Sequence, residues 1–323
     1  MQNKIKGFLV CMFIIAVFPA LIGCNHSQQV NETSKDYIDN SRGEEVDSNA
    51  DLSFIVMGDV HNNVDNFKEA VDDFYKINPN IDALILNGDT VDQGTDEQYE
   101  SMEKAIDKNL SRLPETIIKN IGNHEFYNYD IDTNSKEDID NFTNKYLKFS
   151  GTENVYHDTW IKEYHFISLG SDELNSEDLN TTQASLSETQ LLWLEEKLKE
   201  NYKQGKPIFV FLHQPISTDF FGREWYGVRQ GDKLKQILSK YPEVIIFSSH
   251  THKEFGYDSI QENMPYTMRY TGAVGYTLVK DENSDNGRKR DNSYNNALYV
   301  EVNDNAVTFK QGDVENHKWV YSK

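Results

Sequence analysis

Residues 83–94 read ALILNGDTVDQG, an apolar run that ends in a cluster of polar residues. A short, unbroken apolar run is typical of a strand that is buried on both faces. Five more runs of this kind occur along the chain, and polar residues follow each of them. They are residues 54–57, 116–118, 165–169, 208–212 and 244–247.

Helical patterns separate these runs. Apolar side chains three or four positions apart share one face over residues 64–74 and again over residues 99–113. A third helix is expected after Ser187, because residues 187–190 read SETQ, a capping-box pattern. This alternation of strands and helices predicts an α/β fold in which helices cover a sheet.

The C-terminal part of the chain has a different pattern. We expect a hairpin turn at Asp304 and Asn305 and a surface loop over the polar residues 281–296. Antiparallel strands are expected at residues 266–271, 276–279, 298–302 and 307–310.

Charge and cysteine content exclude several classes of function. The 323-residue chain contains 32 Lys and Arg against 53 Asp and Glu, a formal net charge of −21. This charge argues against binding to a nucleic-acid duplex, which rewards a basic face. Both cysteines, Cys11 and Cys24, lie in the first 24 residues. The rest of the chain therefore has no disulfide framework and no cysteine nucleophile, and His, Asp, Glu or Asn must bind any metal.

The first 24 residues have the pattern of an export signal. Lys4 and Lys6 precede an apolar stretch over residues 8–23, and Leu-Ile-Gly-Cys ends the segment. This quartet resembles the bacterial lipoprotein signal, in which Cys24 becomes the lipidated first residue. A plain transmembrane anchor is the alternative, but the apolar stretch is short for one.

These features predict three segments of chain. Residues 1–23 are expected to be a lipoprotein signal peptide, and residues 24–51, which are mostly polar, a flexible tether. Residues 52–323 are expected to form one folded domain. The domain is then extracytoplasmic and held at the bacterial cell membrane by its lipid anchor only.

Potential metal ligands follow five of the six apolar runs. In open α/β sheets the carboxyl ends of the strands collect the chemistry, so these residues are expected to meet at one edge. A single histidine or aspartate in such a place is usually structural, whereas five clusters in order are hard to explain by packing. The residues are Asp59 and His61, Asp89 and Asp92, Asn123 and His124, His213, and His250 and His252.

The order of these motifs resembles the calcineurin-like metallophosphoesterases. Asp-x-His, Gly-Asp-x-x-Asp, Gly-Asn-His-Glu, a strand-end His and a final His-x-His occur in sequence over most of residues 52–260. The resemblance implies a four-layer αββα fold, in which a central mixed β-sandwich is flanked by helices. It also implies hydrolysis of a small phosphate ester by in-line attack of a hydroxide that bridges two metal ions, with manganese, iron and zinc all compatible with the ligands.

The same resemblance implies a role for each motif residue. Asp89 would bridge the two ions. One ion would be bound by Asp59, His61 and His252. The other would be bound by Asn123, His213 and His250.

Two further residues are implied to act on the substrate. His124 would stabilise the phosphoryl group or protonate the leaving oxygen. Asp92 would orient His124, although a turn former is an equal alternative for this aspartate. In the aromatic loop over residues 220–229, Arg223 or Arg229 could contact phosphate, and a packed loop with solvated arginines is the alternative.

The chain departs from the family pattern at three places. Ser249 stands where glycine usually precedes the last His-x-His, which matters only if the backbone needs a positive φ. Gln93 replaces the arginine of the protein-phosphatase branch, and Val91 and Asp92 leave no tyrosine ligand of the purple-acid-phosphatase kind. Monoester and diester substrates both remain open.

Two other classes of function were weighed. A non-catalytic surface binding protein that kept the fold should have lost a ligand, and none is missing. A serine esterase would need Gly-x-Ser-x-Gly, which the chain lacks.

Overall fold

The computed structural model describes most of the chain beyond residue 48. The described residues are 40–41, 46–47, 49–131, 135–174, 182–216, 227–256, 260–261, 264–284 and 287–322. They all belong to one unit, residues 37–323. Cys24, Arg223 and the predicted signal peptide lie outside the described residues. Within the described part, the helices are too short or too polar to cross a membrane.

A seven-stranded sheet contains the first three predicted strands and the last two predicted C-terminal ones. Its order is β1-β15-β14-β13-β2-β3-β4. Strands β2, β3 and β4 run parallel, and the C-terminal strands add to β2 in antiparallel fashion. The bounds are β1 (Asn40–Ser41), β2 (Leu52–Met57), β3 (Ala83–Asn87), β4 (Thr116–Asn120), β13 (Asn296–Asn303), β14 (Ala306–Asp313) and β15 (Lys318–Ser322).

A six-stranded sheet contains the other three predicted strands. Its order is β5-β6-β7-β8-β10-β9, and its four central strands run parallel. A separate hairpin consists of β11 (Thr277–Lys280) and β12 (Arg288–Asp291). The bounds of the six are β5 (His157–Ile161), β6 (Tyr164–Ser168), β7 (Ile208–Phe211), β8 (Val244–Ser248), β9 (Ile260–Gln261) and β10 (Thr267–Tyr270).

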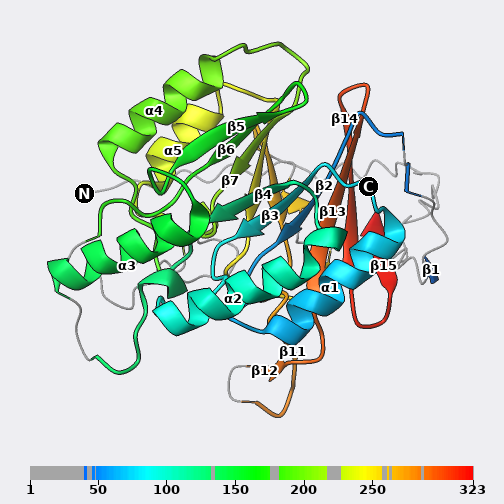
Figure 1. Ribbon diagram of the computed structural model, residues 1–323. Helices are drawn as coiled ribbons and strands as arrows, with labels where there is room; N and C mark the ends of the chain where they lie inside the picture. Colours follow the sequence, from blue (N-terminus) through cyan, green and yellow to red (C-terminus); the bar gives the residue numbers. More distant parts are fainter. Residues whose placement is uncertain are drawn as a thin grey trace, which may run out of the picture. The chain divides into compact units, whose positions relative to one another are not determined.

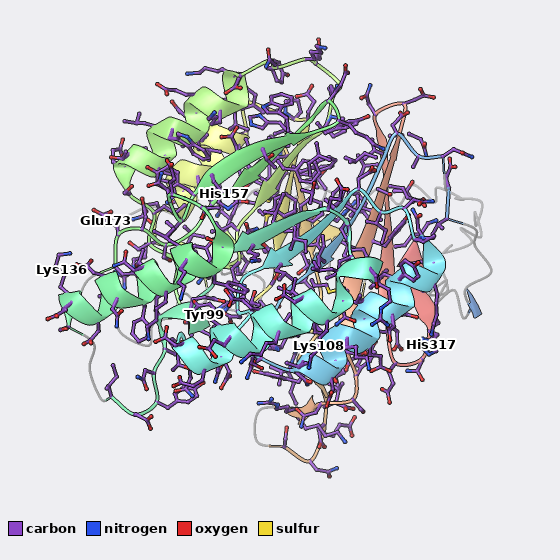
Figure 2. The ribbon with its side chains drawn as sticks, viewed as in Figure 1. Tyr99, Lys108, Lys136, His157, Glu173 and His317 are labelled. Atoms are coloured by element: carbon purple, nitrogen blue, oxygen red, sulfur yellow. The ribbon has the colours of Figure 1, made fainter. Side chains whose placement is uncertain are left out.

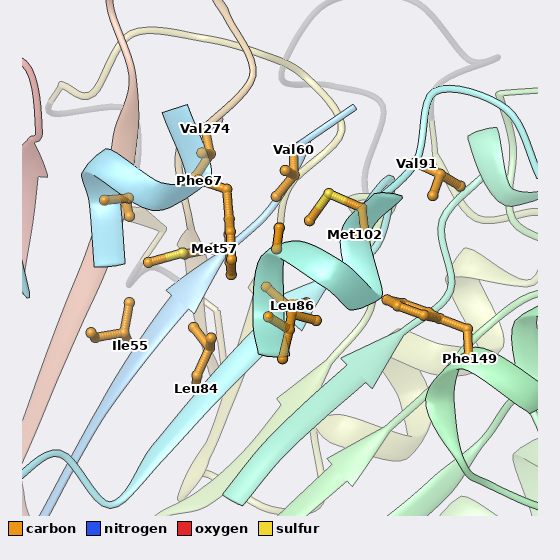
Figure 3. Close-up of a cluster of buried hydrophobic side chains, with 14 of the residues drawn as sticks. Ile55, Met57, Val60, Phe67, Leu84, Leu86, Val91, Met102, Phe149 and Val274 are labelled. Carbon is orange, nitrogen blue, oxygen red and sulfur yellow. The ribbon is translucent and has the colours of Figure 1, made fainter. Parts of the chain in front are cut away.

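Helices cover the outer face of each sheet (Figure 1). On the seven-stranded sheet, Phe67 and Met102 pack with Leu84 and Leu86 in one buried cluster (Figure 3). On the six-stranded sheet, Leu194 belongs to a second cluster. The helices are α1 (Val64–Ile77), α2 (Asp96–Asn109) and α3 (Lys136–Ser150) on the first sheet and α4 (Glu188–Lys199) and α5 (Gly231–Leu238) on the second, with short η1 (Leu110–Arg112) and η2 (His124–Phe126).

Aromatic side chains fill the space between the two sheets. The ring of Phe54 on β2 is fully buried, and its centroid lies 5.1 Å from Phe166, 4.9 Å from Phe209 and 5.9 Å from Phe247. Burial of such a ring contributes about 1.5–3 kcal/mol to folding. With helices outside both sheets, this core makes the four-layer αββα arrangement, and that prediction is confirmed.

The six predicted buried strands and the three predicted helices all form. The hairpin at Asp304 and Asn305 is confirmed, because both residues adopt the positive φ of such turns, 50° and 67°. Two expectations for the C-terminal part were wrong. Strand β10 runs parallel to β8. Residues 281–296 include β12, which pairs with β11 through its backbone although its side chains are charged.

Some residues of the predicted tether contact the sheet. Asn40 and Ser41 pair with β15 as strand β1, and the backbone N–H of Asp47 donates to Glu301 Oε1 at 2.8 Å. Val46 packs against the cluster beneath α1. The boundary at residue 52 stays a prediction, and these contacts indicate that residues just before it add to the domain.

Candidate metal centre

The side chains that follow the parallel strands meet in two groups of three. Their potential ligand atoms lie within 4.8 Å of one another in each group, and every member is buried. The groups combine residues from both sheets, so the site depends on how the sheets pack. The first group is Asp59, His61 and His252, and the second is Asp89, His213 and His250.

In the first group the imidazole nitrogens are directed inward. His252 Nε2 lies 3.3 Å from Asp59 Oδ1 and 3.0 Å from His61 Nε2. His252 Nδ1 donates to the Tyr276 carbonyl at 2.9 Å, which leaves the Nε2 lone pair for a ligand. His61 Nδ1 lies 3.1 Å from Asp92 Oδ1, so the same logic directs its Nε2 inward.

In the second group Asp89 lies between the two sets of ligands. Its Oδ2 is 3.0 Å from His213 Nε2 and 3.8 Å from His61 Nε2 in the first group. His213 Nδ1 donates to the Asn87 carbonyl at 2.8 Å, which again fixes the tautomer. This position suits a carboxylate that is shared by two cations.

The amide of Asn123 is oriented as a ligand would be. Its Nδ2 donates to the Tyr127 hydroxyl at 3.0 Å, whereas its buried Oδ1 has no hydrogen-bond partner. A buried polar atom without a partner is costly, and a cation would satisfy this oxygen. The donor set of carboxylate, amide and imidazole therefore fits a pair of metal ions.

The electrostatics of the buried groups favour bound cations. Burial lowers the pKa of His61 and His252, and it lowers the pKa of His250 to about 3. These imidazoles are neutral, as metal ligands must be. Burial also raises the pKa of Asp59 well above its ordinary value, because its negative charge is poorly compensated.

His213 differs from the other imidazoles of the site in the direction of its pKa shift. Burial alone would lower its pKa, but the carboxylates of Asp89 and Asp59 raise that pKa to about 9. Burial likewise opposes ionisation of Asp89, and the nearby His213 nonetheless holds its pKa well below the usual range. A cation bound by His213 would have to displace its proton, because an imidazole that ligates a metal is neutral.

The backbone is strained at the predicted ligands. Asp59, His61 and Asp89 have φ values of 51°, 50° and 48°, and His250 and His252 have 69° and 52°. Such conformations are rare for residues with a side chain and concentrate at functional sites. Ser249, which follows β8 and directly precedes His250, does not have a positive φ, so serine replaces the family's glycine without strain.

Glu125 is a component of the site to which sequence reasoning assigned no role. Its carboxylate is buried and accepts hydrogen bonds from the N–H groups of Asp89 at 3.0 Å, Thr90 at 2.8 Å and Gly122 at 2.7 Å. Burial and the charge of Asp89 raise its pKa to about 7. Glu125 thus joins the loop after β3 to the loop after β4. In the sequence, only its place at the end of Gly-Asn-His-Glu pointed to such a role.

His124 occupies the rim of the centre. Its N–H donates to Asp89 Oδ1 at 2.9 Å, and its ring Nδ1 donates to the backbone carbonyl of Asp92 at 2.9 Å. The Asp92 carboxylate is 3.5 Å from that nitrogen and nearer to His61. His124 also forms a third potential ligand group with His61 and Asp89, so geometry alone does not separate it from the ligands.

The remaining candidates lie elsewhere in the described part of the chain. The N–H of Arg229 donates to the carbonyl of Ala184 at 2.9 Å, which places its backbone before α4, so its predicted substrate contact stays a prediction. Figure 2 shows His157 and His317 far from each other, on different elements. His317 pairs with Asp73 at 2.8 Å, as a structural histidine would.

Comparison with known proteins identifies the family. The model of the calcineurin-like phosphoesterases matches residues 52–254. The chain belongs to this family. All five motifs of the centre lie in the matched region.

Individual relatives are more distant. "Probable glycerophosphodiester phosphodiesterase GpdQ" of Arcobacter nitrofigilis is 27% identical over 206 residues, which are 60% of this chain and 66% of the relative. A 3',5'-cyclic-nucleotide phosphodiesterase of Nostoc sp. is 25% identical over 182 residues, 56% of this chain and 59% of the relative. The chain thus spans less than two thirds of either relative.

A solved structure supports the fold alone. A dimetal phosphatase from Danio rerio superposes with a TM-score of 0.55 and 13% identity, over 82% of this chain and 97% of that one.

We predict that Glu125→Gln destabilises the protein and weakens metal retention. The amide can accept through only one oxygen, so at least one buried N–H loses its partner, which costs about 1–3 kcal/mol. Urea unfolding and elemental analysis measure both effects. Glu196→Gln on the exposed face of α4 is the matched control and should change neither. An unchanged free energy of unfolding for Glu125→Gln would contradict its role as a link between the loops.

Proposed function

We propose that this chain is a dinuclear, metal-dependent phosphoesterase. The observation that carries the proposal is the pair of buried ligand groups with Asp89 between them. Family membership supports hydrolysis of a phosphate ester, and the names of both relatives favour a phosphodiester. The two cations would supply Lewis-acid polarisation of the phosphoryl oxygens and would lower the pKa of water.

The residues of the chain have distinct tasks in this proposal. Asp59, His61 and His252 would hold one cation, and Asn123, His213 and His250 would hold the other. Asp89 would be shared by both. Because its side chains come from separate loops of two sheets, the centre is preorganised before substrate arrives.

His124 is the proposed acid for the leaving oxygen. Its Nδ1 is held by the Asp92 carbonyl, so Nε2 is the nitrogen that can contact substrate. Asp92 thereby has two effects, because its carbonyl orients His124 while its carboxylate orients His61. In this proposal Asp92 therefore orients the predicted ligand His61 as well as His124.

We also propose that the enzyme works outside the cytoplasmic membrane as a lipoprotein. The basic residues, the apolar stretch and the Leu-Ile-Gly-Cys quartet of residues 1–24 support this location. A lipid anchor would hold a domain whose net negative charge is repelled by anionic lipids.

If Cys24 is lipidated, Cys24→Ala should abolish attachment of the lipid. The variant should lose incorporation of labelled fatty acid in a bacterial host and should leave the membrane fraction after cell lysis. Ser27→Ala, in the predicted tether, is the matched control and should keep the label. Equal labelling of Cys24→Ala and the full-length protein would sink the lipoprotein proposal.

Metal content is expected to be two ions per chain. Protein purified without chelator should show this ratio by elemental analysis and should hydrolyse bis(p-nitrophenyl) phosphate. Chelation should abolish hydrolysis, and manganese or zinc should restore it. Two bound ions without hydrolysis of any mono- or diester would favour the non-catalytic binding protein, whereas failure to bind metal would contradict the centre.

His124 and His213 should fail in different ways. His124→Ala should keep both ions and lose turnover by about 10²–10⁴-fold, the usual contribution of a positioned acid. The loss should be smaller for good leaving groups, which need little protonation. His213→Ala should lose metal as well as turnover, because it removes a ligand. If His124→Ala emptied a metal site, His124 would be a ligand and the acid would have to be sought elsewhere.

A further inference from the structure

A cationic side chain lies next to the first ligand group. Arg290 is exposed on β12, and its guanidinium carbon is 3.7 Å from the centroid of the Tyr276 ring. The other face of the Tyr276 ring stacks on the predicted ligand His252, with ring centroids 3.9 Å apart and an interplanar angle of 14°. Tyr276 therefore separates Arg290 from the metal centre by the thickness of one ring.

The backbone fixes this placement. The N–H of Leu278 on β11 donates to the His252 carbonyl at 2.6 Å, and Leu278 pairs directly with Arg290 across the hairpin. Tyr276, just before β11, accepts the hydrogen bond from His252 Nδ1. The β11–β12 hairpin, visible at the bottom of Figure 1, is thus attached to a ligand by three contacts, and Arg290 has a defined position relative to it.

The guanidinium has bonding capacity to spare. Its Nε donates to Asn292 Oδ1 at 2.6 Å, and among the residues that the structure describes no carboxylate lies within ion-pair distance of it. Its two terminal nitrogens can donate to an anion as a planar pair.

The charge of Arg290 reaches the acid side of the centre. Hydrogen bonding to His61 is the main reason that the pKa of Asp92 is low, and Arg290 lowers it further. Burial raises the pKa of Tyr129, and Arg290 partly opposes that rise. Geometry agrees with this: the Tyr276 ring beneath Arg290 has its centroid 5.5 Å from that of His61, and the His61 centroid lies 4.4 Å from that of His124. Arg290 therefore lies on the His61 side of the centre, where His124 is the proposed acid for the leaving oxygen.

We propose that Arg290 forms an anion-binding subsite that takes a second negatively charged group, a carboxylate or a phosphate, on the leaving-group side of the substrate. The two ligand groups would bind the scissile phosphoryl group. The Tyr276 ring lies between His252 and Arg290, so the guanidinium would contact a different part of the substrate. This inference rests on the proposed phosphoesterase activity and narrows its substrate to esters with an anionic leaving group. It assigns the anion contact to the β11–β12 hairpin, a different segment from the loop with Arg223 and Arg229.

A matched pair of chromogenic diesters tests the subsite. Methyl 4-nitrophenyl phosphate and methyl 3-carboxy-4-nitrophenyl phosphate differ only by a carboxylate on the leaving group. We expect Arg290→Met to lower kcat/KM about 5- to 10-fold for the carboxylated ester and less than about 2-fold for the other, as for loss of one charge-assisted contact at an exposed site. Arg290→Lys should give an intermediate value, because the charge remains but the planar fork is lost.

Lys289→Met is the matched control. It removes the same charge from the adjacent position of β12, whose side chain points to the other face of the hairpin. It should leave the ratio of the two kcat/KM values unchanged. If Lys289→Met and Arg290→Met changed this ratio equally, only the overall positive charge of the hairpin would matter. If Arg290→Met lowered kcat/KM equally for both esters, Arg290 would only support Tyr276. Either result overturns the subsite.

Binding of the free leaving group separates this inference from the proposed function. Calorimetry should show that 3-carboxy-4-nitrophenol binds the unmodified protein at least about 5-fold more tightly than it binds Arg290→Met, whether or not either ester is hydrolysed. Hydrolysis of neither ester would contradict the phosphoesterase proposal. Equal binding to both proteins would contradict the subsite.

Discussion

The carboxylate of Asp89 is the point at which the parts of this site meet. One oxygen lies 3.0 Å from His213 Nε2, and the other accepts the N–H of His124 at 2.9 Å. The N–H of Asp89 itself is bound by Glu125. A fully buried carboxylate costs several kcal/mol unless positive charge and hydrogen bonds compensate it. Its neighbours therefore have to stay in place, and the loops after β3, β4 and β7 are fixed together.

Packing of the two sheets makes this convergence possible. Phe54 contacts rings on β6, β7 and β8 of the opposite sheet, which sets the spacing and the alignment of the parallel strands. The loops at their carboxyl ends then reach the ligand positions through strained turns. Gly88 shows how tight this approach is, because a Cβ there would come within 2.6 Å of the His213 ring. The packed core thus stabilises the strained backbone conformations of the predicted ligands.

The parts of the molecule that sequence could predict are those with local signals. Apolar runs identified the buried strands, and the polar residues behind them identified the ligand groups. Helix α3 was not among the predicted helices, although it has a local signal, because Ser135 and Asp138 form a capping box at its start. Strand β12 reads Arg-Lys-Arg-Asp, which has no apolar alternation, and only its pairing with β11 makes it a strand. The bonds of Glu125 and the position of Arg290 depend on contacts between distant segments, which no local pattern reveals.

The β11–β12 hairpin supports the predicted ligand His252 and also carries Arg290. The family match ends at residue 254, just after the last predicted ligand. Tyr276 lies beyond that limit, yet its carbonyl fixes the tautomer of His252 and its ring covers the same imidazole. The segment outside the shared region therefore completes the metal centre and, from the same hairpin, presents a cation toward the leaving-group side. A hairpin of this kind can vary its exposed side chains without disturbing the ligands, because its attachment to His252 uses backbone groups and one aromatic ring.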